Sequence, residues 1–169
     1  MNHAVIVKSQ TASSNIDAYM RNAVAEVDLD NGNIFILETQ RPDDGIDNEV
    51  WEATAPEAGK LAGVWVACSP WAKVERGVAI GNPQEIYNVK EKVFDAAYLQ
   101  PKDLFTVTAE ALDGTAGDNE YVVATAGSFK MTWAAAPVVD AFCAKLVKPT
   151  TIGTTVSSLP AFKFEVISN

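Results

Sequence analysis

The segment Phe162-Lys163-Phe164-Glu165-Val166 decides the fold class of this 169-residue chain. Its three apolar side chains occupy alternate positions, and the two charged side chains fall between them. Successive side chains of a β-strand point to opposite faces, so this order puts the apolar residues on one face and the charged residues on the other. The segment is therefore predicted to be a strand with one buried face and one face in water.

Three further segments repeat this alternation. They are Phe129 to Trp133, Phe105 to Glu110, and Phe142 to Leu146, each with apolar and polar side chains on opposite faces. Shorter apolar segments bounded by turn residues are also predicted to be strands. These lie at residues 3–8, 23–29, 34–38, 50–53, 63–67 and 121–125, which makes about ten short strands in all.

The apolar composition favours sheet over helix. The chain has 28 Val and Ile residues, only eight Leu residues and 12 Thr residues. Branched side chains pack well on a pleated surface and lose freedom in a helix. We expect one mainly β domain over residues 1–169, an antiparallel β-sandwich or barrel with little helix. Within this domain, residues 1–49 could form an N-terminal arm or hairpin layer.

Two local predictions concern turns and helix. Asp30-Asn31-Gly32-Asn33 separates two strand-like segments, and Asn and Gly tolerate positive φ, so a hairpin is expected there. Residues 84–99 place Ile86, Val89 and Val93 near helical spacing, which predicts a short helix, although residues 94–99 fit an extended strand equally well.

Negative charge is concentrated in one segment. The formal net charge is −9, and the segment from Glu26 to Glu57 carries nine net negative charges, so the rest of the chain is neutral. An acidic surface repels phosphate backbones, which argues against nucleic-acid binding. The segment is either a solvated acidic surface or a docking site for a basic partner or a divalent cation. The EF-hand spacing fails from both Asp28 and Asp43.

The residues that could carry chemistry do not form a recognisable motif. His3, the only histidine, lies near the chain end, and Cys68 and Cys143 are 75 residues apart in apolar surroundings typical of buried thiols. A Cys68–Cys143 disulfide would require neighbouring strands. The pair Asp43/Asp44 is one of many carboxylate pairs expected by chance. We expect no catalytic, cofactor-binding or metal-binding residues, and hence no enzyme.

The tryptophans and the apolar runs bear on two other classes of ligand. Trp51, Trp65, Trp71 and Trp133 could form a platform for sugars or bases, but tryptophans in strand patterns more often belong to a core or a subunit contact. A membrane partner is not expected, because no apolar run approaches the ~20 residues of a spanning helix and no signal-peptide pattern begins the chain.

Several stretches together resemble a known class of protein. They read VWEATAP (50–56), LAGVWVACSP (61–70), FDAAYLQPKDLFTVT (94–108), YVVAT (121–125) and SFKMTW (128–133). They resemble small virion proteins of tailed bacteriophages that decorate or cement the capsid, over about residues 50–167 and more loosely at the N-terminus. The turn Pro101-Lys102-Asp103 departs from the common form of this turn, which carries Gly where this chain has Lys102.

The resemblance implies a structural role in a virion. It implies a β-clip-like variant of the expected fold and a non-catalytic protein, made in the host cytoplasm, that binds the major capsid protein on the capsid exterior. It also implies a homo-oligomer, with a trimer favoured. The remaining alternatives are a structural protein of the tail or neck, a carbohydrate- or ligand-binding β-sandwich, and, third, an enzyme that uses carboxylates.

Overall fold

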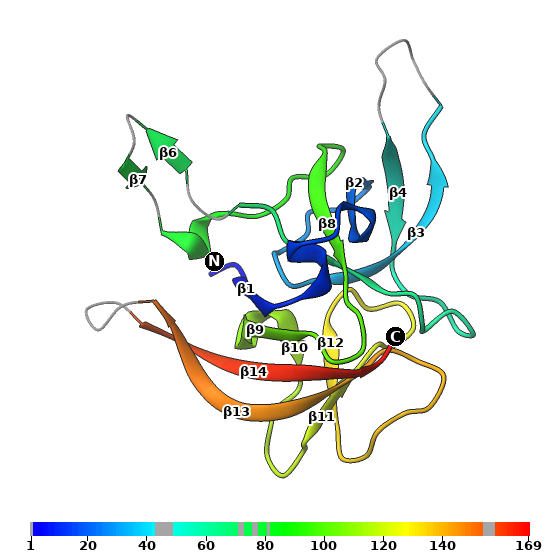
Figure 1. The fold of residues 1–169 in the computed structure, drawn as a ribbon, viewed down its shortest axis with the longest axis vertical. Helices are drawn as coiled ribbons and strands as arrows, with labels where there is room; N and C mark the ends of the chain where they lie inside the picture. Colours follow the sequence, from blue (N-terminus) through cyan, green and yellow to red (C-terminus); the bar gives the residue numbers. More distant parts are fainter. Residues whose placement is uncertain (1, 43–48, 71–72, 76–77, 81, 154–157) are drawn as a thin grey trace.

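The computed structural model describes residues 2–42, 49–70, 73–75, 78–80, 82–153 and 158–169, with no side chains described from 71 to 81. The chain is mainly β, as predicted, and its strands form a seven-stranded sheet, a closed five-stranded barrel and a separate two-stranded ribbon. Figure 1 shows the barrel above the seven-stranded sheet. Within the described ranges the only helical segments are four 3-10 turns, and none could cross a membrane.

The seven-stranded sheet has the strand order β1-β9-β14-β13-β11-β12-β10, and the barrel has the order β2-β4-β3-β5-β8. The sheet strands are β1 (Ile6–Gln10), β9 (Leu104–Thr108), β14 (Ser158–Ser168), β13 (Cys143–Gly153), β11 (Tyr121–Val123), β12 (Met131–Ala134) and β10 (Leu112–Asp113). The barrel strands are β2 (Met20–Ala25), β4 (Val50–Thr54), β3 (Ile34–Gln40), β5 (Trp65–Ala67) and β8 (Phe94–Tyr98). The ribbon joins β6 (Lys73–Glu75) to β7 (Val78–Ile80), and the 3-10 turns are η1 (Ala12–Ser14), η2 (Asp17–Tyr19), η3 (Pro83–Glu85) and η4 (Ala109–Ala111).

Strand β14 confirms the alternation that identified it. Phe164 and Val166 are fully buried in the core between sheet and barrel, and Phe162 packs against that core. Strand β9 departs from the predicted single wet face, because Thr106 and Thr108 are buried as well as Phe105 and Val107. Val5, which continues the pairing of β1 with β9, donates its amide to the buried Thr108 hydroxyl over 3.2 Å.

A second, smaller core fills the barrel. It consists mostly of alanines, with Phe35 packed edge-to-face on Phe94 at a centroid distance of 5.5 Å. Barrel diameter grows with strand number, and eight strands leave just enough room for side chains, so five strands leave less. The alanines at this core are Ala23, Ala25, Ala53, Ala67 and Ala96.

The hairpin predicted at Asp30–Asn33 is wrong in its pairing, although its turn is present. Strand β2 does not pair with β3, because β4 lies between them and runs parallel to β2. Gly32 has φ +93°, and a Cβ there would lie 3.2 Å from both Ala111 and Val107. The turn is wedged between barrel and sheet, which explains why Asn31 and Asn33 are buried.

The helix predicted over residues 84–99 is also wrong. The only helical turn there is η3, and the second half of the segment is strand β8, the extended alternative. In β8, Phe94 and Ala96 face the barrel core, whereas Ala97 faces the core between the two layers. A strand buried on both faces has apolar residues at consecutive positions, which mimics helical spacing over a short window.

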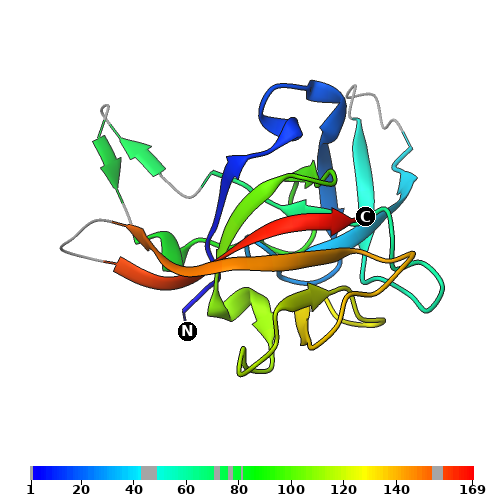
Figure 2. The ribbon, with the colours of Figure 1, turned by 60° about the horizontal axis from the view of Figure 1, so that its bottom comes forward.

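The N-terminal segment contributes to both layers. Strand β1 pairs with β9 at one edge of the sheet, and β2 and β3 belong to the barrel. Figure 2 shows the dark blue β1 lying beside β9 and the C-terminal strand β14.

Candidate functional site

His3 serves as an anchor for the N-terminal segment. Its Nδ1 lies 2.6 Å from an Asp30 carboxylate oxygen, and its ring stacks on Tyr87 at 4.4 Å. The second Asp30 oxygen accepts a hydrogen bond from the Ala4 amide over 3.2 Å. Among the described residues, no group of three or more His, Cys, Asp or Glu side chains is arranged to hold a metal ion. His3 therefore ties the chain to the Asp30–Asn33 turn.

The two cysteines are free thiols and lie apart, in different layers. Cys143 is buried in β13, and Cys68 lines an open hollow of about 420 Å³ with Lys8, Met20 and Asp95. Burial raises the pKa of Cys68 from 9.0 to about 11; the Lys8 ammonium opposes this shift and the Asp95 carboxylate adds to it. A thiol with this pKa stays protonated near neutral pH and is a poor nucleophile.

The tryptophans do not form a single platform. Trp133 belongs to the core, as the sequence interpretation favoured, packed on Phe162 and Phe164 at 5.2 and 5.5 Å. Trp51 is half-buried on β4, and Trp71 lies outside the described residues.

Trp65 belongs instead to a half-exposed aromatic group on the barrel. Its ring lies 5.2 Å from Tyr98, which stacks on Tyr19, and the Arg21 guanidinium lies 5.9 Å from the Trp65 ring. We call Tyr19, Arg21, Trp65 and Tyr98 the aromatic cluster.

The acidic segment lies on the barrel. Glu38 and Glu57 approach Lys60 at 3.3 and 3.9 Å, and Glu52 approaches Arg41 at 3.7 Å. Exposed pairs of this kind contribute little to stability, so most of the negative charge remains available to a partner. Asp43, Asp44 and Asp47 lie outside the described residues.

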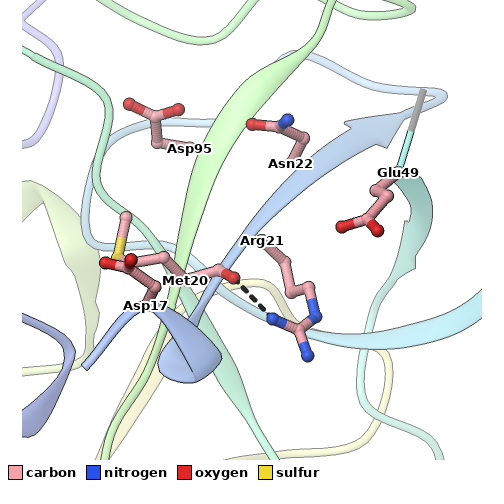
Figure 3. Close-up of a pocket in the computed structure, with 6 residues that line it drawn as sticks. All are labelled: Asp17, Met20, Arg21, Asn22, Glu49 and Asp95. Carbon is pink, nitrogen blue, oxygen red and sulfur yellow. Dashed lines mark hydrogen bonds between the residues drawn. The ribbon is translucent and has the colours of Figure 1, made fainter. Parts of the chain in front are cut away.

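An acidic hollow opens beside the aromatic cluster. Figure 3 shows the residues that line this hollow. The carboxylates of Asp17, Glu49 and Asp95 lie around strand β2. Its volume is about 270 Å³, and its only described cation is Arg21, whose Nη1 donates to the Met20 carbonyl over 2.8 Å. Three carboxylates and one guanidinium give the hollow a negative potential that suits a cationic group.

A second open hollow, of about 350 Å³, lies on the outer face of the seven-stranded sheet. We call it the lysine groove. It is lined by Val7, Ser9, Thr106, Lys148, Thr150, Thr151, Ile152, Gly153 and Lys163. Sequence reasoning placed Lys163 on a wet face but missed the groove, because only the strand register brings Lys148 and Thr106 beside it.

Two structures project from the same side of the molecule. Beyond Ala161, the hairpin of β13 and β14 is paired only with itself, from Thr151–Pro160 outward to Gly153–Ser158, and we call this part the arm. The β6–β7 ribbon is hydrogen-bonded, among the described strands, to neither sheet nor barrel. Figures 1 and 2 both show the ribbon and the arm on the left.

Comparison with protein families, curated proteins and solved structures finds no match to this chain. The fold is that of a mainly β protein in which a sheet packs on a small barrel. The function of the protein is inferred from the surfaces of this fold.

Proposed function

We propose that this chain is a non-catalytic structural protein of a phage virion that binds the outer capsid lattice and decorates or stabilises it. The observation that carries the proposal is the β6–β7 ribbon. A two-stranded hairpin alone in water is marginally stable, and three or more strands or a packing surface are normally needed. A ribbon held away from both cores is therefore suited to being completed by a partner surface such as the major capsid protein.

The chemistry of the described side chains supports a structural role. Nucleophilic catalysis needs an activated nucleophile beside an oriented base. Here the accessible thiol, Cys68, is held protonated, and the only imidazole is engaged with Asp30 and Tyr87. The resemblance noted in the sequence points in the same direction.

The direct test is to locate the protein in its parent particle. Cryo-electron microscopy of purified virions should show ordered copies on the capsid exterior at lattice axes. Copies found only at the tail or neck would support the second structural version. Absence of the protein from purified virions would reject both.

A binding assay tests the ribbon itself. Shells that lack the protein should bind the full chain, and a variant with residues 72–81 replaced by a short Gly-Ser linker should lose most of that binding. The matched control shortens the exposed turn at residues 114–118, and it should bind normally. Equal binding by the two variants would remove the ribbon from the interface.

The aromatic cluster favours one alternative function, carbohydrate binding. A half-exposed Trp65 flanked by Tyr98 and beside an acidic hollow offers a stacking face and hydrogen-bond acceptors for hydroxyl groups. Binding on a glycan array that Trp65→Ala abolishes and Trp51→Ala leaves intact would support this function. No response across sugars would exclude it.

A further inference from the structure

The register of the seven-stranded sheet places two lysines directly opposite each other. Lys148 on β13 faces Lys163 on β14, and the same cross-strand row continues through Thr106 to Val7. Like charges at directly opposite positions repel and destabilise a sheet. Lys60, Lys102 and Lys145 each have a carboxylate within 4 Å, whereas within the described part of the chain Lys148 and Lys163 have none. The groove thus carries two adjacent positive charges that pair with no carboxylate among the described residues.

Hydroxyl groups line the same groove. Thr106 is 6% exposed and lines the groove beside the two lysines. Ser9, Thr150 and Thr151 add further hydroxyls to the lining. Two ammonium groups beside several hydroxyl donors match the acceptor oxygens of carboxylates, with which they form strong charge-assisted hydrogen bonds.

The chain supplies such carboxylates on another part of its surface. Exposed acidic side chains of the Glu26–Glu57 segment include Glu26, Asp28, Glu49 and Glu52. Strands β3 and β4 lie on the right in Figures 1 and 2, whereas the arm that walls the groove lies on the left. Glu49, just before β4, and Glu52, within β4, therefore lie on the opposite side of the molecule from the lysine groove of their own chain.

We infer that the lysine groove binds the acidic segment of a second copy of this chain. The two surfaces differ, so the contact is head-to-tail, and repetition closes it into a ring if the rotation permits or extends it into a filament. The biological setting of this inference rests on the proposed function, because a symmetry axis of a capsid lattice would be occupied by a ring of copies. The contact itself requires only the isolated protein.

Sedimentation of the full chain tests the contact. The wild type should associate at ~50 mM salt and dissociate toward monomer at ~500 mM, because screening shortens the range of charge attraction. The variant Lys148→Glu/Lys163→Glu should weaken association by at least about a hundredfold. The matched control Lys90→Glu/Lys92→Glu makes the same change in net charge at two exposed lysines outside the groove. Lys90 lies beside Asp28 of the acidic segment, so this control should associate at least as tightly as the wild type.

A charge swap tests which surface meets the groove. The variant Glu49→Lys/Glu52→Lys should also associate weakly by itself, since its segment has lost four units of negative charge. Mixing it with Lys148→Glu/Lys163→Glu should restore association. The acidic groove of one variant then meets the less acidic segment of the other, and the native lysine groove meets a native acidic segment. Circular dichroism spectra that match the wild type would establish that each variant is folded.

Three results would overturn the inference. They are a monomeric wild type at low salt, wild-type association by the groove variant, and equal weakening by the Lys90/Lys92 control. Mixing that fails to restore association would reject the acidic segment as the occupant. None of these results touches the proposed function, which the location of the protein in virions decides.

Discussion

Lys102 occupies a backbone conformation that normally belongs to glycine. It has φ +82° in the turn from Gln100 to Asp103, where the Asp103 amide donates to the Gln100 carbonyl over 2.9 Å. Proline second and a positive φ third define a type II turn, and glycine is preferred at that third position. The Asp103 carboxylate holds the turn by accepting from the amides of Gln100 and Ala12 at 2.8 and 2.9 Å. The turn predicted from Pro101-Lys102-Asp103 is therefore present despite the lysine.

Replacing Lys102 by Gly should stabilise the fold by about 0.5–1 kcal/mol. The left-handed conformation costs a non-glycine residue about 1–2 kcal/mol, which exceeds the added entropy of glycine in the unfolded chain. The exposed Lys102–Glu165 pair at 3.0 Å adds little. Chemical denaturation measures the change, with Lys102→Ala as the control that removes the ion pair but keeps the strain. A Gly variant less stable than the Ala variant would contradict this account.

Cys68 should react with alkylating agents only at strongly alkaline pH. The thiolate is the reactive form, and a pKa raised from 9.0 to about 11 means that the half-maximal rate of iodoacetamide alkylation lies near pH 11. Asp95→Asn should shift this midpoint to lower pH, and Lys8→Met should shift it to higher pH, because the two charges act in opposite directions. A midpoint at or below 9 in the native protein would show that burial does not control this thiol.

At the scale of elements, the sequence predicts strands better than their partners. Alternation in β12, β13 and β14 correctly reveals one apolar face, because each strand has the core on one side. Alternation contains no information on register or strand order. The parallel pairing of β2 with β4 and the lysine pair across β13 and β14 therefore cannot be predicted from it. Strand β8, the extended alternative for residues 94–99, is apolar on both faces, which is why its pattern also fits helical spacing.

The barrel should tolerate no enlargement of its alanines. Ala96 is fully buried in the barrel core, and Ala96→Leu should destabilise the fold by about 1–3 kcal/mol or more, since added methylenes force neighbours off their rotamers. Ala109→Leu, at an exposed position, should change stability by less than about 0.5 kcal/mol. Thermal unfolding of both variants measures the difference, and equal effects would mean that the barrel interior has spare room.

For the whole molecule, the two layers are joined by the side chain of Asn169. Its Oδ1 accepts from the Val64 amide, and its Nδ2 donates to the carbonyls of Val64 and Leu99, each over 2.8 Å. Asn169 follows β14 of the sheet, whereas Val64 and Leu99 flank barrel strands β5 and β8. No sequence pattern marks this residue, because its importance depends on which backbone groups the packing leaves without partners.

Removing this link should destabilise the fold more than removing a surface asparagine. Val64 and Leu99 are fully buried, so Asn169→Ala leaves their main-chain groups without partners and should cost about 2–3 kcal/mol. Asn119→Ala removes only the exposed hydrogen bond to the Thr115 carbonyl, and it should cost less than about 1 kcal/mol. Comparing the unfolding free energies checks this, and a cost for Asn169→Ala no greater than that for Asn119→Ala would count against it.

The strand order has a consequence for how the chain is made. Strand β14 lies between β9 and β13 in the sheet but follows both along the chain. Strand β1 cannot pair until β9, about a hundred residues later, has been synthesised. During synthesis at roughly 5–20 residues per second, the nascent chain therefore carries unpaired strand edges for several seconds. Fragments that end before β14 keep those edges exposed, which makes them substrates for chaperones and proteases.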